Sequence, residues 1–224
     1  AIGVYVPPRT YWPEIERICR KYDILLFADV VICGYGRTGE WFGAQYFGFT
    51  PDIMTTAKGL TSGYIPMGAV LFNDRIATVL RDKGGELAHG YTYSGHPVCA
   101  VVALENIRIL QEEKIVETCK NDTGPYLAER IKMLGEHPLV GETRGAGMLG
   151  ALELVPNKAE RKFFAERGNV GSLCRNIALK NGLILRATYD SMLISTPLII
   201  SRTEIDEFFE KAWKSLNETA QAIA

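Results

Sequence analysis

The sequence predicts an α/β fold, in which part of a parallel-sheet domain is followed by a smaller α+β domain. A helical stripe precedes the run Ile24–Ala28, which is apolar at every position, as in a strand that is covered on both faces. From about residue 125 the pattern changes to short strand-like runs that alternate with amphipathic helices. We therefore predict two domains, over residues 1–124 and 125–224.

The first domain contains one helix and three strands before a long helical segment. Thr10 and Pro13 suit the start of a helix over residues 10–22, and strands are predicted at 24–28, 53–56 and 67–72. The segment 97–134 is mostly helical, with an interruption at 121–124.

In the second domain, strands are predicted at 139–140, 147–155, 183–186 and 192–195. A helix over 170–181 ends at Gly182, which suits a left-handed cap. The last helix starts at a capping box formed by Ser201 and Glu204.

Composition excludes several classes of protein. Of the 224 residues, 47% are hydrophobic and 23% are charged, which does not fit a disordered chain. The formal net charge of −1 provides no basic surface for nucleic acid or an anionic membrane. The five cysteines form no Cys-x-x-Cys pair, so we expect free thiols in a reducing compartment, the cytoplasm, and no metal site.

A glycine-rich loop matches a dinucleotide-binding pattern, with Gly34, Gly36 and Gly39 at the required spacing. That fingerprint must open a helix, so that the pyrophosphate meets the helical N–H groups. Here an aromatic sequence broken by Gly and Pro follows the loop. We therefore expect a structural loop and no NAD site.

Asp29 and Lys58 form the most informative pair. Each follows an apolar run, at the end of a predicted strand, and in a parallel sheet this edge binds ligands. A plain ion pair between them is one interpretation. Ala57, Gly59 and Gly63 leave space beside the lysine, which favours a site for a flat ring.

Three stretches around this pair resemble the signature of the class III aminotransferases. They are Leu26–Gly39, Thr50–Leu60 and the later block His89–Pro97, in the order that the family has them. The Val-Ile pair at 31 and 32 is similar to the omega-amino-acid or amine:pyruvate branch. The resemblance implies a pyridoxal 5′-phosphate (PLP) enzyme of fold type I, of which this chain is part of the large domain and the small C-terminal domain.

The resemblance also implies roles for residues near the first two stretches. Lys58 would hold PLP as a Schiff base and later move the substrate proton, and Asp29 would keep the pyridine nitrogen protonated. Val31, two residues further along the strand, would pack on one face of the ring, or it is an ordinary core valine.

Two further sites follow from the resemblance. Tyr91 and Thr92 would donate to the PLP phosphate, normally that of a partner subunit, although Thr92 could instead bond its own turn. Arg186 matches an arginine that binds a substrate carboxylate, and a solvated arginine at a strand end is the alternative.

The chain departs from the family in two ways. The position that usually carries Glu is Val30, so we expect altered packing or reduced activity, and Val30→Glu should increase turnover or PLP retention. The first part of the large domain is absent, so we expect the N-terminal half of the subunit to be a separate, cleaved or missing piece. The family also implies a homodimer or a dimer of dimers.

The predicted activity is transfer of an amino group from an amine or omega-amino acid to a keto acid such as pyruvate. One alternative is another PLP enzyme of this fold, such as an aminomutase, a racemase or a decarboxylase. The other alternative is a truncated or degenerate fragment without activity.

Overall fold

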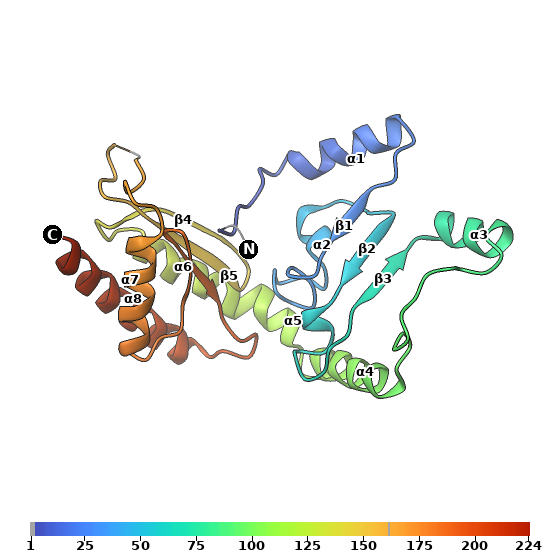
Figure 1. Cartoon of the computed structure of the whole chain (residues 1–224). Helices are drawn as coiled ribbons and strands as arrows, with labels where there is room; N and C mark the ends of the chain where they lie inside the picture. The colour runs from blue at the N-terminus through green and yellow to red at the C-terminus, as the bar shows by residue number, and fades with distance from the viewer. Residues whose placement is uncertain (1–2, 161) are drawn as a thin grey trace. The chain divides into compact units, whose positions relative to one another are not determined.

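A computed structural model describes residues 3–160 and 162–224 (Figure 1). The chain forms two compact units, which we call the first unit and the second unit. The first unit is made of residues 7–117, and the second unit combines the residues before 7 with 118–224. The division expected at residues 124 and 125 falls in the same helical stretch as the observed one, and the two-domain assignment remains a prediction for the whole subunit.

The first unit is built on a three-stranded sheet in the order β1-β2-β3. Strands β1 (Phe27–Asp29) and β2 (Ile53–Thr56) are parallel, whereas β3 (Ala69–Phe72) runs antiparallel to β2. The sequence did not indicate this reversal of direction at the last strand. No crossover helix lies between β2 and β3, and a parallel connection would need one.

Four helices and one 3₁₀ turn complete the first unit. They are α1 (Tyr11–Lys21), α2 (Gly43–Phe47), η1 (Lys58–Leu60), α3 (Asp74–Lys83) and α4 (Pro97–Glu112). The sequence predicted α1 and α4 but missed α2 and α3. Thr10 precedes α1 in a helical conformation and its side chain makes no capping hydrogen bond, contrary to expectation.

Strand β1 is shorter than predicted and is not covered on both faces. Ile24 and Phe27 are each about half exposed, whereas Leu26 and Ala28 are buried. The first residues of the predicted strand do not join the sheet, because the Leu26 N–H donates to the Asp52 carboxylate and not to a neighbouring strand. Leu26 and Ala28 pack with Cys19 of α1 and with Phe49, and the rings of Trp12 and Phe49 stack with their centroids 4.4 Å apart.

The second unit is built on an antiparallel sheet in the order β4-β5-β7-β6. Its strands are β4 (Val140–Ala146), β5 (Leu149–Leu154), β6 (Arg186–Thr188) and β7 (Ser191–Ser195). The helical segments are α5 (Ile115–Thr118), which spans the unit boundary, the π-helical turn η2 (Cys119–Thr123), α6 (Gly124–Leu134), α7 (Asn169–Lys180) and α8 (Arg202–Ile223). Helix α8 packs against α6 and α7, and the core between helices and sheet includes Leu127, Leu152, Met192, Ile205 and Leu216.

Several local signals of the second unit are confirmed. Ser201 and Glu204 form the expected capping box at the start of α8. Gly182 follows α7 with φ +72°, in the left-handed region that glycine tolerates best. The helical run from residue 97 breaks at Lys114, whose φ is +52°, before the interruption that the sequence predicted.

Candidate active site

Asp29 and Lys58 lie at the same edge of the sheet. Asp29 is the last residue of β1 and pairs in register with Thr55 of the parallel strand β2, and Lys58 follows the end of β2 by two residues. Both side chains are exposed, and no ion pair joins them. Lys58 makes no ion pair with any other residue within 3–160 and 162–224. The topology therefore brings an amine and a carboxylate to one sheet edge and leaves both available to a ligand.

The backbone of Lys58 is held in an unusual conformation. Its φ is +47°, in the left-handed region that few residues other than glycine adopt. The turn closes through the Leu60 N–H to the Ala57 carbonyl at 3.0 Å and the Thr61 N–H to the Lys58 carbonyl at 3.2 Å. Because Leu60 and Thr61 are buried while Lys58 is exposed, the turn anchors itself in the protein and directs the lysine outwards.

Tyr35 packs against the other side of this turn. A Cβ atom added at Gly59 would lie 3.0 Å from the Cβ of Tyr35, which is tighter than most real contacts of a Cβ atom. The Tyr35 hydroxyl donates to the Oγ1 of Thr56 at 3.2 Å, at the end of β2. Tyr35 belongs to the glycine-rich loop, so this loop supports the lysine turn. No long helix follows the loop directly, unlike in a dinucleotide-binding fingerprint.

Asp29 is oriented by the turn that follows it. The Val31 N–H donates to Oδ1 of Asp29 at 3.0 Å, which leaves Oδ2 for another donor. β1 has already ended at Val31, so strand alternation, on which its predicted direction rested, does not apply. Val31 is half-buried, and its contact with a ring remains a prediction. Val30 is buried at 2% exposure, so a Glu in its place would bring its carboxylate into the interior.

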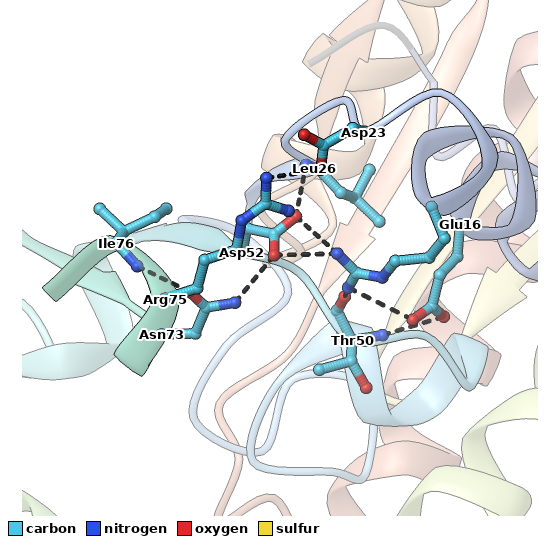
Figure 2. Close-up of polar contacts among 9 residues, drawn as sticks. Glu16, Asp23, Leu26, Thr50, Asp52, Asn73, Arg75 and Ile76 are labelled. Carbon is cyan, nitrogen blue, oxygen red and sulfur yellow. Dashed lines mark hydrogen bonds and ion pairs between the residues drawn. The ribbon is translucent and has the colours of Figure 1, made fainter. Parts of the chain in front are cut away.

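The opposite ends of the same strands are joined by a buried carboxylate (Figure 2). Asp52, just before β2, accepts hydrogen bonds from the Leu26 N–H at 2.8 Å, from Arg20 at 2.9 Å and from Asn73 at 2.8 Å. Asn73 in turn caps α3 by accepting from the Ile76 N–H. One side chain thus connects α1, the approach to β1, β2 and the start of α3.

The pKa of Asp52 is set by two opposing effects. Burial alone would raise the pKa, but the hydrogen bonds from the Leu26 N–H, Arg20 and Asn73 favour the ionised form and lower it below its usual value. The cluster therefore depends on Asp52 remaining ionised.

Tyr91 and Thr92 lie in the exposed segment between α3 and α4 (Figure 1). The Tyr91 N–H already donates to Oγ of Ser94 at 2.8 Å, so it is not free for a phosphate. Thr92 makes no hydrogen bond to its own turn in the described chain. The structure does not connect either residue to Asp29 or Lys58 by a hydrogen bond.

Arg186 opens β6, where it pairs in register with Leu193. It is exposed, and its guanidinium has no carboxylate partner among the described residues. It belongs to the second unit, whereas Asp29 and Lys58 belong to the first.

Residues 3–160 and 162–224 also bear on other kinds of site. Within them no three His, Cys, Asp or Glu side chains group as a metal site, and all five cysteines are free thiols. No helix in this part of the chain has the length and apolar character to cross a membrane. Two cavities, of about 460 Å³ and 360 Å³, are lined by neither Asp29 nor Lys58.

The aminotransferase class III family profile matches residues 1–216. The chain belongs to the class III aminotransferase family. Proteins of this family depend on PLP, which confirms the predicted family and cofactor. The aminotransferase chain is 61% identical over 221 residues to a putrescine–pyruvate aminotransferase of Pseudomonas aeruginosa, covering 99% of this chain and 48% of that protein. A chloroplastic gamma-aminobutyrate transaminase 3 of Solanum lycopersicum is 39% identical, with 99% and 43% covered.

Solved structures confirm the fold. The omega transaminase of Pseudomonas jessenii in complex with PMP superimposes with a TM-score of 0.93 at 43% identity, covering 98% of this chain and 49% of that one. An engineered thermostable omega transaminase gives a TM-score of 0.94 at 42% identity, with 99% and 50% covered. The aminotransferase chain therefore has PLP fold type I, and it spans about half the length of these relatives.

The exposed residues at the sheet edge fit PLP chemically. An unpaired amine suits its aldehyde, and a carboxylate with one free oxygen suits its ring nitrogen. Sequence reasoning missed two residues that support the lysine turn, Asn106 of α4 and Tyr35, and it missed the role of Asp52 at the opposite ends of the strands. A polar Asn within the apolar stripe of residues 98–110 was the one available signal for Asn106.

Proposed function

We propose that the protein is a PLP-dependent transaminase that moves an amino group from a diamine such as putrescine, or an omega-amino acid, to pyruvate. The observation that carries this proposal is the exposed pair of Asp29 and Lys58 at the carboxyl ends of two adjacent parallel strands. The 61% identity to a putrescine–pyruvate aminotransferase supports the choice of substrates.

In this proposal Lys58 Nζ binds the cofactor aldehyde. The same amine, when free, would remove the proton from the substrate Cα. Asp29 would favour the protonated form of the ring nitrogen. PLP, when bound, supplies the electron sink that makes this proton acidic. Val31 borders one face of the ring.

The remaining assignments complete the proposed site. Thr92 donates its hydroxyl to the cofactor phosphate of a partner subunit in a homodimer or a dimer of dimers, and Tyr91 lies beside it. Arg186 binds the carboxylate of the keto acid. We place the enzyme in the cytoplasm, where its five thiols stay reduced.

Borohydride reduction of the assembled protein with PLP, followed by peptide mapping, tests the role of Lys58. We expect the pyridoxyl mass on Lys58 in the native protein and in Lys83→Ala, which removes an exposed lysine at the end of α3. Lys58→Ala should carry no label and should form no alanine from putrescine and pyruvate. A label on another lysine would overturn the assignment. Products other than alanine and an aldehyde would favour a different PLP reaction.

The role of Arg186 has its own test, because putrescine has no carboxylate and pyruvate has one. Arg186→Met should raise the KM for pyruvate by about tenfold or more, the usual effect of losing a charge-assisted pair. The KM for putrescine should stay within about twofold. Equal increases for both substrates would contradict a specific carboxylate contact.

A further inference from the structure

The turn that carries Lys58 is bound by a single side chain from α4. Asn106 Nδ2 donates to the carbonyl of Gly59 at 2.9 Å and to that of Leu60 at 3.1 Å. These are the two residues that follow Lys58 in η1. The amide lies more than 45 positions further along the chain, so the contact joins two distant elements of the first unit.

The orientation of this amide is also fixed. Ser62 Oγ donates to Oδ1 of Asn106 at 2.6 Å, which leaves Nδ2 to face the two carbonyls. Ser62 has φ +49°, so Lys58 and Ser62, the first and last residues of the segment 58–62, are both in the left-handed region. Such conformations persist only when the surrounding contacts impose them.

We propose that Asn106 is a positioning residue for Lys58, which it serves through the backbone of Gly59 and Leu60, with Ser62 setting its amide. The inference rests on the proposed function, because it matters only if Lys58 holds the cofactor. Its hydrogen bonds within the described residues go to Gly59, Leu60 and Ser62 and not to the Lys58 side chain. Without it, the turn loses the contacts that keep Lys58 at φ +47°, and the amine samples more directions.

The experiment compares Asn106→Ala with Asn176→Ala in the assembled protein. Asn176 is an exposed residue of α7 and serves as a matched control. Two readouts are taken with PLP as the probe, namely its dissociation constant and the pH midpoint of the absorbance of the bound cofactor. The second is measured only on molecules that hold PLP, so a general loss of stability does not move it.

We expect Asn106→Ala to raise the dissociation constant of PLP about tenfold, the effect of losing one net hydrogen bond at the turn. The pH midpoint should shift by at least about half a unit, because the environment of Lys58 Nζ changes. Ser62→Ala should weaken PLP binding by about threefold. It removes the hydrogen bond that orients the Asn106 amide but keeps the two hydrogen bonds from Nδ2 to the turn. The control should leave both quantities unchanged.

A dissociation constant within about twofold of the native value, with an unchanged pH midpoint, would overturn the proposal. If Asn106→Ala does not fold, Ser62→Ala serves as the test. An unchanged dissociation constant and an unchanged pH midpoint in Ser62→Ala would then overturn the proposal. A native protein whose Lys58 is not labelled by reduction with PLP would instead overturn the proposed function.

Discussion

Gly59 limits what can stand next to the reactive lysine. The Cβ of an alanine at this position would lie 3.0 Å from the Cβ of Tyr35 and 3.2 Å from its ring, and Tyr35 is buried. We therefore expect Gly59→Ala to shift the lysine turn and to destabilise the protein by about 1–3 kcal/mol, as overpacking does. Chemical denaturation and PLP binding measure the two effects.

Gly90→Ala is the control for that substitution. Its added Cβ would meet only Ser94 Oγ at 3.7 Å, an ordinary contact. The free energy of unfolding of Gly90→Ala should match that of the native protein within about 0.5 kcal/mol. Equal free energies of unfolding for the two glycine variants would contradict the prediction, because they would mean that Tyr35 moves aside at little cost.

Which of these residues the sequence could reveal depends on how their contacts are made. Asp29 and Lys58 were predictable, because each follows an apolar run and the family motif surrounds it. The polarity of Asn106 within an apolar stripe was a signal, but its partners were not predictable, since they are backbone carbonyls far away in the chain. The direction of Val31 was argued from a strand that ends two residues earlier.

At the scale of elements, Asp52 fixes how the strands that lead to the site begin. Its pKa lies below the usual value, so its carboxylate stabilises the fold fully above the unfolded-state pKa of about 3.9. That contribution disappears as the pH falls through the lower pKa of the folded state.

We therefore expect Asp52→Asn to reduce the free energy of unfolding by about 2 kcal/mol at neutral pH, because Arg20 loses its buried partner. The difference from the native protein should shrink below about pH 4. Urea titrations at several pH values measure it, with the exposed Asp82→Asn as control. A difference that stays constant down to acid pH would contradict an ionic role.

Helix α7 receives its cap from a different element. Its N-cap residue is Gly168, which has no side chain, and Asp190 from the β6–β7 turn accepts the N–H groups of Gly168 and Gly171, both at 2.9 Å. The capping box of α8 was readable from the sequence because its residues are neighbours. This cap was not, because its acceptor lies about twenty positions further on.

Asp190→Ala should lower the free energy of unfolding by about 2 kcal/mol, the upper range for losing a helix cap. The hydrogen bond of the Gly171 N–H is buried, so this group would be left without a partner. Asp190→Asn keeps one acceptor oxygen, so its free energy of unfolding should decrease by less. Chemical denaturation of both variants compares their free energies of unfolding. A larger decrease for Asp190→Asn than for Asp190→Ala would contradict this account.

At the scale of the whole molecule, Arg144 holds the segment 3–6 within the second unit. It donates to the Gly3 carbonyl at 2.9 Å and to Glu153 at 2.8 Å, and it lies over the ring of Tyr5. Both ionic side chains are less than a tenth exposed.

Arg144→Met leaves Glu153 buried without its cation, and should destabilise the protein by about 3–5 kcal/mol. Adding Glu153→Leu should recover part of that loss, because the unpaired charge is then gone. Chemical denaturation of the two variants provides the comparison, with the exposed Arg175→Met as control. A double variant less stable than Arg144→Met would contradict this account.

The assignment of the residues before 7 to the second unit also affects how the chain folds. The second unit cannot be completed until residues 7–117 have been gathered into a closed loop, whose ends are the segment 3–6 and the helical run from Thr118. The conformational entropy lost in closing a loop grows with the length of flexible chain inside it. It is smaller when that chain has already condensed. The sheet that carries Lys58 should therefore become compact first, and the docking of the segment 3–6 on Arg144 should be among the last steps of folding.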